Sequence, residues 1–154
     1  EYTGAIKSAK HLFGKINLVL LPDTIVTLSR QINLVEEIDL KLKHSGFTFL
    51  FMPEKRAEML RTKGCLVLNS SGRVIDYEDK PTEHVDRFNG YWCAFAFSHE
   101  TFDASIAFME QSTLKKNIPD QDIRKTSIFN SEIITVDAFE DLGTWSEIRK
   151  LLSK

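Results

Sequence analysis

An unbroken apolar run over residues 18–21 constrains the fold of this chain more than any other feature. A strand covered on one face alternates apolar and polar residues, whereas an uninterrupted run is typical of a strand covered on both faces. Asn17 stands at the start of the strand, where we expect its amide to reach water, and Pro22 and Asp23 end it. The run therefore predicts a buried strand within a sheet, followed at once by a carboxylate.

Helical and strand-like patterns alternate along the remaining sequence, which is typical of an α/β fold with three layers. Asn-Ser-Ser-Gly at residues 69–72 lies between two apolar runs and predicts an antiparallel hairpin, so the mainly parallel sheet is expected to be mixed. Thr144 is the expected N-cap of a last helix that turns Trp145 inward. Helices are expected at residues 5–13, 34–45, 54–62, 99–111 and 145–152, and strands at 16–21, 47–52, 65–68, 73–77, 91–97 and 133–136.

The composition is that of an ordinary globular domain. The chain has 154 residues, 42% of them hydrophobic, which is enough for one domain with its own core. A net charge of -2 argues against a broad nucleic-acid surface. No apolar stretch approaches the roughly 20 residues of a membrane span, and no signal peptide is visible. Cys65 and Cys93 each lie within an apolar run, so we expect buried free thiols and a cytoplasmic location.

Two carboxylates follow apolar elements at places where a sheet can bind ligands. Asp23 comes directly after the first strand, and ligands of open α/β sheets bind at the carboxyl ends of strands. Asp141 follows a short apolar element just before the last helix, so the two acids could share one Mg²⁺ ion. The alternatives are local: Pro22-Asp23 makes a turn, and Asp141 supports the cap at Thr144.

Lys80 is a candidate phosphate ligand. It follows the strand at residues 73–77 and precedes Pro81, and a residue before proline is confined to extended conformations. A stiff backbone would aim the ammonium at a phosphate as a point charge. The alternative is a surface turn.

Taken in order, these segments resemble the motifs of the sugar-phosphate nucleotidyltransferase family, the nucleoside-diphosphate-sugar pyrophosphorylases. Asp23 resembles the family's first metal carboxylate, and Asp141 with Gly143 resembles the second, in Asp-x-Gly-Thr. The remaining matches are Val74, Tyr77, Lys80 and Pro81 in the sugar-phosphate segment, Asn89-Gly90-Tyr91 in the next strand, and Thr3-Gly4-Ala5-Ile6 at the start.

The resemblance implies a Rossmann-like fold and an enzyme of nucleotide-sugar biosynthesis. A nucleoside triphosphate and a sugar 1-phosphate would give a nucleotide sugar and pyrophosphate. Asp23 and Asp141 would bind Mg²⁺, and Lys80 would neutralise the sugar phosphate. Asp79, Asn89 and the backbone at Gly90 would bind and orient the sugar.

Two departures from the family pattern matter. Asp79 stands where the family has Glu, and the seven glycines include no Gly-x-Gly, so no phosphate-binding loop is visible. We therefore expect residues 1–154 to be the C-terminal portion of one nucleotidyltransferase-like domain whose N-terminal units are missing, inactive alone. Such a chain would form a homo-oligomer or pair with a polypeptide that supplies the loop. The alternatives are a non-catalytic nucleotide- or sugar-binding regulatory module of the same fold, and a metal-dependent glycosyltransferase.

Overall fold

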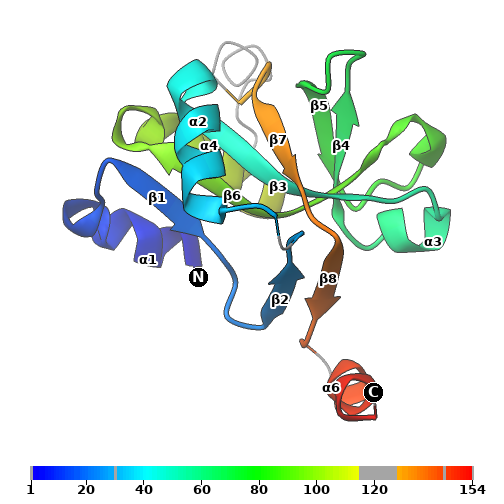
Figure 1. The fold of residues 1–154 in the computed structure, drawn as a ribbon. Coiled ribbons are helices and arrows are strands. Elements are labelled where there is room, and N and C mark those ends of the chain that lie inside the picture. Colours follow the sequence, from blue (N-terminus) through cyan, green and yellow to red (C-terminus); the bar gives the residue numbers. More distant parts are fainter. Residues whose placement is uncertain (1, 30, 115–127, 144, 154) are drawn as a thin grey trace.

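A six-stranded sheet runs through the centre of the computed structural model, which describes residues 2–29, 31–114, 128–143 and 145–153 (Figure 1). The strands follow the order β5-β4-β6-β3-β7, and β1 pairs with β6 beside this path. Each strand expected from the sequence is present. Their bounds are β1 (Ile16–Val19), β3 (Phe47–Pro53), β4 (Gly64–Leu68), β5 (Val74–Asp79), β6 (Gly90–Ser98) and β7 (Glu132–Thr135).

The sheet is mixed, as the sequence predicts. β3 and β7 form a parallel pair, while β1, β3 and β4 each run antiparallel to β6, and β5 runs antiparallel to β4. As a result β1, β3, β4 and β7 point the same way. Most strands of the sheet therefore share one direction, as expected of a mainly parallel sheet. Most neighbouring pairs are nevertheless antiparallel, because β6 runs the other way and lies between β3 on one side and β1 and β4 on the other.

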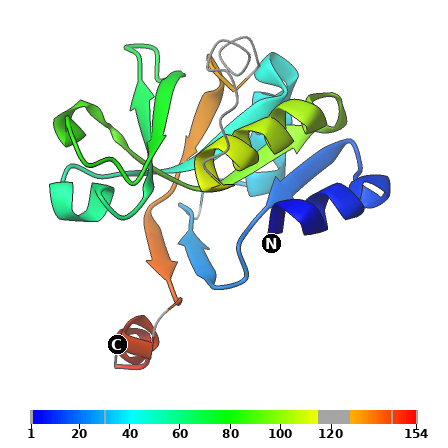
Figure 2. The ribbon, with the colours of Figure 1, turned by 180° about the vertical axis from the view of Figure 1, so that it is seen from behind.

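Helices cover both faces of the sheet and complete three layers. The helix α2 packs on one face (Figure 1), and α1 and α4 lie on the other (Figure 2). Asn33 caps α2 as expected, with its Oδ1 accepting from the backbone N–H of Val35, and Gly46 ends it at a left-handed φ of 68°. The helices are α1 (Tyr2–Ser8), α2 (Leu34–Ser45), α3 (Ala57–Leu60), α4 (Phe102–Leu114) and α6 (Trp145–Leu152), with 3-10 turns η1 (Lys10–Leu12), η2 (Val85–Arg87) and η3 (His99–Thr101).

The strand buried on both faces is β3. Its residues from Phe47 to Phe51 are all buried. Phe47 and Phe49 stack among aromatic rings beneath α4, while Leu50 packs on the α2 side. Burying one such phenylalanine contributes about 1.5–3 kcal/mol, so this aromatic layer is a main source of stability.

The environment of β1 differs from the sequence-based expectation. Val19 packs towards the aromatic layer, but on the opposite face Leu18 is 37% exposed and Leu20 is 46% exposed. Asn17 is only 8% exposed, and its Nδ2 donates to the carbonyl oxygens of Gly14 and Phe97. The expectation of an amide in water was wrong because β1 lies against β6, where the buried amide satisfies backbone carbonyls.

A two-stranded ribbon that the sequence did not predict lies beyond the carboxyl ends of β1 and β7. It pairs β2 (Thr24–Thr27) with β8 (Ala138–Asp141) in antiparallel register. Between β7 and β8, the N–H of Val136 donates to the carbonyl oxygen of Phe51 in the sheet, and the N–H of Asp137 donates to that of Thr27 in the ribbon. At its end lies α6, where Trp145 is 77% exposed (Figure 1). The expectation that Trp145 turns inward was therefore wrong; its proposed cap, Thr144, lies outside the described residues.

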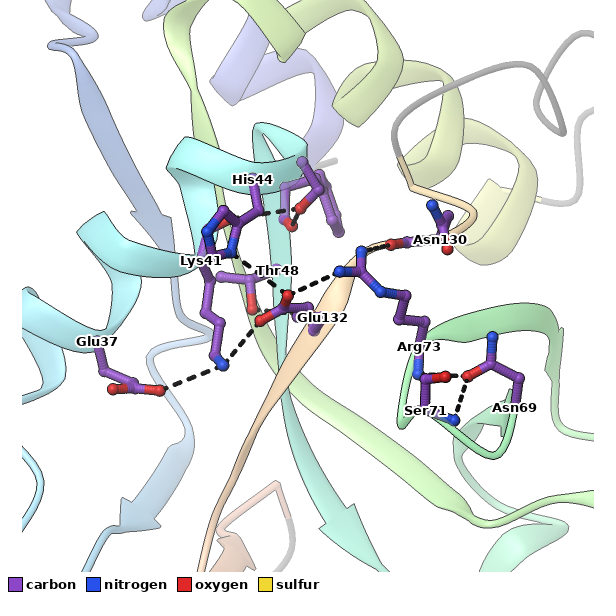
Figure 3. A network of polar contacts seen from close by, with 11 residues as sticks. Glu37, Lys41, His44, Thr48, Asn69, Ser71, Arg73, Asn130 and Glu132 are labelled. Carbon is purple, nitrogen blue, oxygen red and sulfur yellow. Dashed lines mark hydrogen bonds and ion pairs between the residues drawn. The ribbon is translucent and has the colours of Figure 1, made fainter.

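Glu132 at the start of β7 gathers a polar network at the opposite end of the strand (Figure 3). Its carboxylate accepts from Lys41 of α2 at 2.8 Å and from Arg73 at 3.0 Å, with His44 at 3.4 Å. The hydrogen bond from Lys41 is the main cause that lowers the pKa of Glu132. The network ties β7 to the helix layer and to the β4–β5 hairpin.

The two cysteines are free and buried, as expected. Burial raises the pKa of the thiols of Cys65 and Cys93 to about 12 in each case. Both therefore remain protonated thiols and act as small core residues.

Candidate functional site

Asp23 and Asp141 meet at the outer end of the β2–β8 ribbon. Asp23 directly precedes β2, and Asp141 ends β8 as the register partner of Thr24. Leu142 donates its backbone N–H to the carbonyl oxygen of Asp23 over 2.7 Å. The structure thus brings together the two acids singled out in the sequence, on a ribbon beyond the carboxyl edge of the main sheet.

The two carboxylates face the same point beside Gly143. A Cβ atom added to Gly143 would stand 3.0 Å from Oδ1 of Asp141 and 3.6 Å from Oδ2 of Asp23. The backbone N–H of Gly143 donates to the same Oδ1 over 3.0 Å. Glycine therefore leaves the space between the carboxylates open, and a side chain at this position would crowd it.

Lys63 is the cation that the structure places at this site. Its Nζ donates to Oδ2 of Asp141 over 2.7 Å and lies 5.3 Å from the centroid of the Phe139 ring. The Lys63 side chain is 19% exposed. Its hydrogen bond is the main cause that lowers the pKa of Asp141, followed by the bond from Gly143. Sequence reasoning missed Lys63, because nothing near Lys63-Gly64 signals a partner so distant in the chain.

Asp79 and Lys80 lie beside this group through their backbone. Asp79 is the register partner of Gly64, and the N–H of Lys80 donates to the carbonyl oxygen of Lys63 over 2.9 Å. The expected extended backbone at Lys80 was wrong: its φ is 52°, in the left-handed region. The backbone turns at Lys80, directly after the end of β5, while its N–H stays bonded to Lys63. The Lys80 side chain is exposed.

Asn89 and Gly90 have structural roles that the sequence did not indicate. Oδ1 of Asn89 accepts the backbone N–H of Leu68 over 2.8 Å, joining β4 to the start of β6. A Cβ at Gly90 would stand 2.1 Å from the carbonyl oxygen of Met52, closer than any real contact. Glycine is thus required where the start of β6 pairs with the end of β3, and a role of either residue in sugar binding remains a prediction.

In the part of the chain that the structure describes, Asp23 and Asp141 are the candidate metal ligands. Among the described residues no group of three or more His, Cys, Asp or Glu side chains comes together. Mg²⁺ commonly binds one or two protein carboxylates and completes its shell with waters and substrate phosphates. Asp23 and Asp141 fit that pattern, since both carboxylates face the open space left by Gly143.

A cavity of about 400 Å³ lies at the other edge of the sheet. It opens between the end of α2 and the start of β1, and is bordered by Lys15, Asp39, Lys43 and Thr101. None of the acids and lysines around Asp141 borders it. The cavity and the acidic pair are therefore separate features.

The comparisons with known proteins establish the fold. No protein-family model matches the chain, and no curated protein matches it in sequence. A solved structure from Bacillus anthracis, assigned as a glucose-1-phosphate thymidylyltransferase and in complex with sucrose, matches with a TM-score of 0.66 and 15% sequence identity. The match covers 98% of this chain and 59% of that chain. The chain thus has an α/β, Rossmann-like nucleotidyltransferase fold and spans about three-fifths of that neighbour. None of the described helices is long and apolar enough to cross a bilayer.

Proposed function

We propose that this chain is part of a sugar-1-phosphate nucleotidyltransferase, which joins a nucleoside triphosphate to a sugar 1-phosphate and releases pyrophosphate. The supporting observation is the convergence of Asp23, Asp141 and Lys63 next to the Asp79-Lys80 segment. These residues come from four parts of the chain and meet on a fold shared with a structure assigned as a thymidylyltransferase.

The proposed chemistry is an in-line displacement at phosphorus. An oxygen of the sugar 1-phosphate attacks the α-phosphorus, and the bond from that phosphorus to the pyrophosphate oxygen breaks. Asp23 and Asp141 would hold Mg²⁺, which supplies charge neutralisation on the phosphates. Lys80 would pair with the sugar phosphate, because its side chain is exposed and its backbone is bonded to Lys63, the partner of Asp141.

Asp79, Asn89 and the backbone at Gly90 are the proposed sugar-binding groups. Asp79 and Asn89 are both half-buried and keep some access to solvent. Gly90 is buried where β6 begins, so its contribution would come from backbone groups alone.

The triphosphate site is proposed to need further polypeptide. The sequence contains no Gly-x-Gly with which backbone N–H groups could wrap a triphosphate. We therefore propose that the 154-residue chain alone does not catalyse transfer, and that the active protein works in the cytoplasm. A pyrophosphate-release assay on the isolated chain measures this directly.

A regulatory module that binds a nucleotide or a sugar is the second candidate function. The observation in its favour is the ion pair between Lys63 and Asp141, which occupies one of the two metal carboxylates. In a non-catalytic chain, this ion pair could serve as a purely structural contact.

A ligand-binding experiment distinguishes the nucleotidyltransferase from the regulatory module. Saturation-transfer NMR on the 154-residue chain with Mg²⁺ and a panel of sugar 1-phosphates should detect one member of the panel, and omitting Mg²⁺ or introducing Lys80→Ala should weaken the signal. Lys43→Ala, on the exposed side of α2, is the matched control. A sugar signal that needs neither Lys80 nor the phosphate group favours the regulatory module. The absence of any signal over the whole panel contradicts the nucleotidyltransferase proposal.

A further inference from the structure

We infer that Lys63 is a built-in counter-ion that sets the affinity of the Asp23–Asp141 pair for a divalent cation. The inference rests on the proposed function, because it assumes that these carboxylates bind a metal. In this arrangement a metal ion competes with the Lys63 ammonium for Asp141. Lys63 is thus a positioning residue whose charge raises the metal concentration that the site requires.

The geometry of the ion pair supports direct competition. The Lys63 Nζ lies 2.7 Å from Oδ2 of Asp141, while Oδ1 of the same carboxylate faces Asp23 across Gly143. One carboxylate therefore serves both the ammonium and the candidate metal position. Two positive charges on one carboxylate repel each other, so a bound divalent cation weakens the pair with Lys63.

The position of Lys63 is held by its backbone and not only by its charge. Its N–H donates to the carbonyl oxygen of Leu60, and its carbonyl oxygen accepts from Lys80 and from the Cys65 thiol. The Phe139 ring lies beneath the ammonium. The backbone that carries the ammonium therefore stays in place when the side chain changes, which makes a test by substitution meaningful.

The backbone bond between Lys63 and Lys80 adds a second consequence. An ammonium displaced from Asp141 remains attached next to the segment proposed to bind the sugar phosphate. A phosphate oxygen is the natural new partner for such a charge. A bound metal ion is then expected to raise the affinity for phosphate, and a bound phosphate to raise the affinity for the metal ion.

Manganese binding tests the inference without any measurement of activity. Mn²⁺ is titrated into the 154-residue chain, and the free ion is followed by electron paramagnetic resonance. Lys63→Met should bind Mn²⁺ up to roughly fivefold more tightly than the unmodified chain, the change expected when one partly exposed ion pair no longer competes. Lys63→Arg, which keeps the charge, should restore the weaker affinity. Lys43→Met removes a lysine paired with Asp39 at 2.6 Å, far from the site, and should change nothing.

The outcomes separate this inference from the proposed function. Equal Mn²⁺ affinity in the unmodified chain and Lys63→Met overturns the role of Lys63 and leaves the metal site standing. No binding to either protein at millimolar Mn²⁺ overturns both. Tighter binding that disappears when Asp23→Asn is added supports both. Circular dichroism verifies folding, and Lys63→Gln replaces the methionine variant if that variant does not fold.

Discussion

The backbone N–H of Leu142 donates to the carbonyl oxygen of Asp23 over 2.7 Å, and this bond joins the two segments that carry the candidate metal ligands. Because it connects backbone groups, it survives a change of the Asp23 side chain. The charge of the site can therefore be removed at Asp23 while the two segments stay in place.

Asp23→Asn should greatly slow turnover and leave stability nearly unchanged. Asparagine keeps the shape of the side chain and removes its charge. In the active protein we expect turnover to fall by roughly a hundredfold or more, since a metal ion contributes several kcal/mol to the transition state. The melting temperature should change by no more than about 2 °C. Steady-state kinetics and calorimetry measure the two effects, and a large fall in stability with intact turnover would contradict the proposed role.

Lys80 offers a test in which stability and binding move in opposite directions. A non-glycine residue in the left-handed region costs about 1–2 kcal/mol, and Lys80 stands there at a φ of 52°. Lys80→Gly should stabilise the fold by up to about 1 kcal/mol while raising the Michaelis constant for the sugar 1-phosphate. Lys80→Ala should raise the same constant without the gain in stability. If neither variant changes the use of the sugar phosphate, Lys80 is a surface residue.

Gly90→Ala should be among the most destabilising single substitutions in the chain. The added Cβ would stand 2.1 Å from a backbone oxygen of Met52 and 2.6 Å from the Phe51 ring, and the backbone cannot give way cheaply. We expect a loss of about 3 kcal/mol, at the upper end of ordinary overpacking. Gly4→Ala in α1 is the matched control: its Cβ meets nothing within 4 Å, and it should stabilise the helix slightly. Urea unfolding compares the two.

Glu132 should make stability depend on pH in the acid range. Its carboxylate has a lowered pKa in the folded state, so the unfolded chain binds the proton more readily. The stabilisation is therefore complete above the unfolded pKa of about 4.3 and is lost as the pH falls through the folded value. Glu132→Gln should cost about 1–2 kcal/mol at pH 7 and show a weaker dependence on pH below 5. Urea midpoints between pH 3 and 7 provide the measurement; parallel curves for both proteins would refute it.

The uncovered face of β1 should cause self-association of the isolated chain. Ile16, Leu18 and Leu20 are 36%, 37% and 46% exposed on one face of an edge strand. Exposed apolar edges recruit partners. Light scattering should give a mass that rises with concentration, and Leu18→Ser with Leu20→Ser should return it to the monomer value. Leu12→Ser, which removes a more exposed leucine on η1, should not.

Local signals predicted the framework of the fold well. Asn33 and Gly46 mark the two ends of α2 because capping is a property of a few neighbouring residues. Gly72, at a φ of 72°, makes the turn of the β4–β5 hairpin for the same reason. Residues 47–52 were recognised as a strand, but the burial on both faces that was expected of residues 18–21 belongs to β3 instead.

Features that depend on distant partners were beyond such signals. The strands β2 and β8 exist because they pair with each other, and neither Thr24–Thr27 nor Ala138–Asp141 is apolar enough to be recognised alone. Asn17 is buried because carbonyl groups of other segments receive its amide. The pairing of Asp23 with Asp141 was foreseen from motif order, whereas Lys63 was not, since no pattern connects it to either acid.

The ribbon that carries the two acids has only four residue pairs, and its strands are separated by most of the chain. A two-stranded ribbon is marginally stable by itself, and closing so long a loop is slow. Amide protons of β2 and β8 should consequently exchange with solvent sooner than those of β3 and β6. The site would then form last during folding and open first during fluctuation, so that any ligand bound between Asp23 and Asp141 also slows the opening of the ribbon.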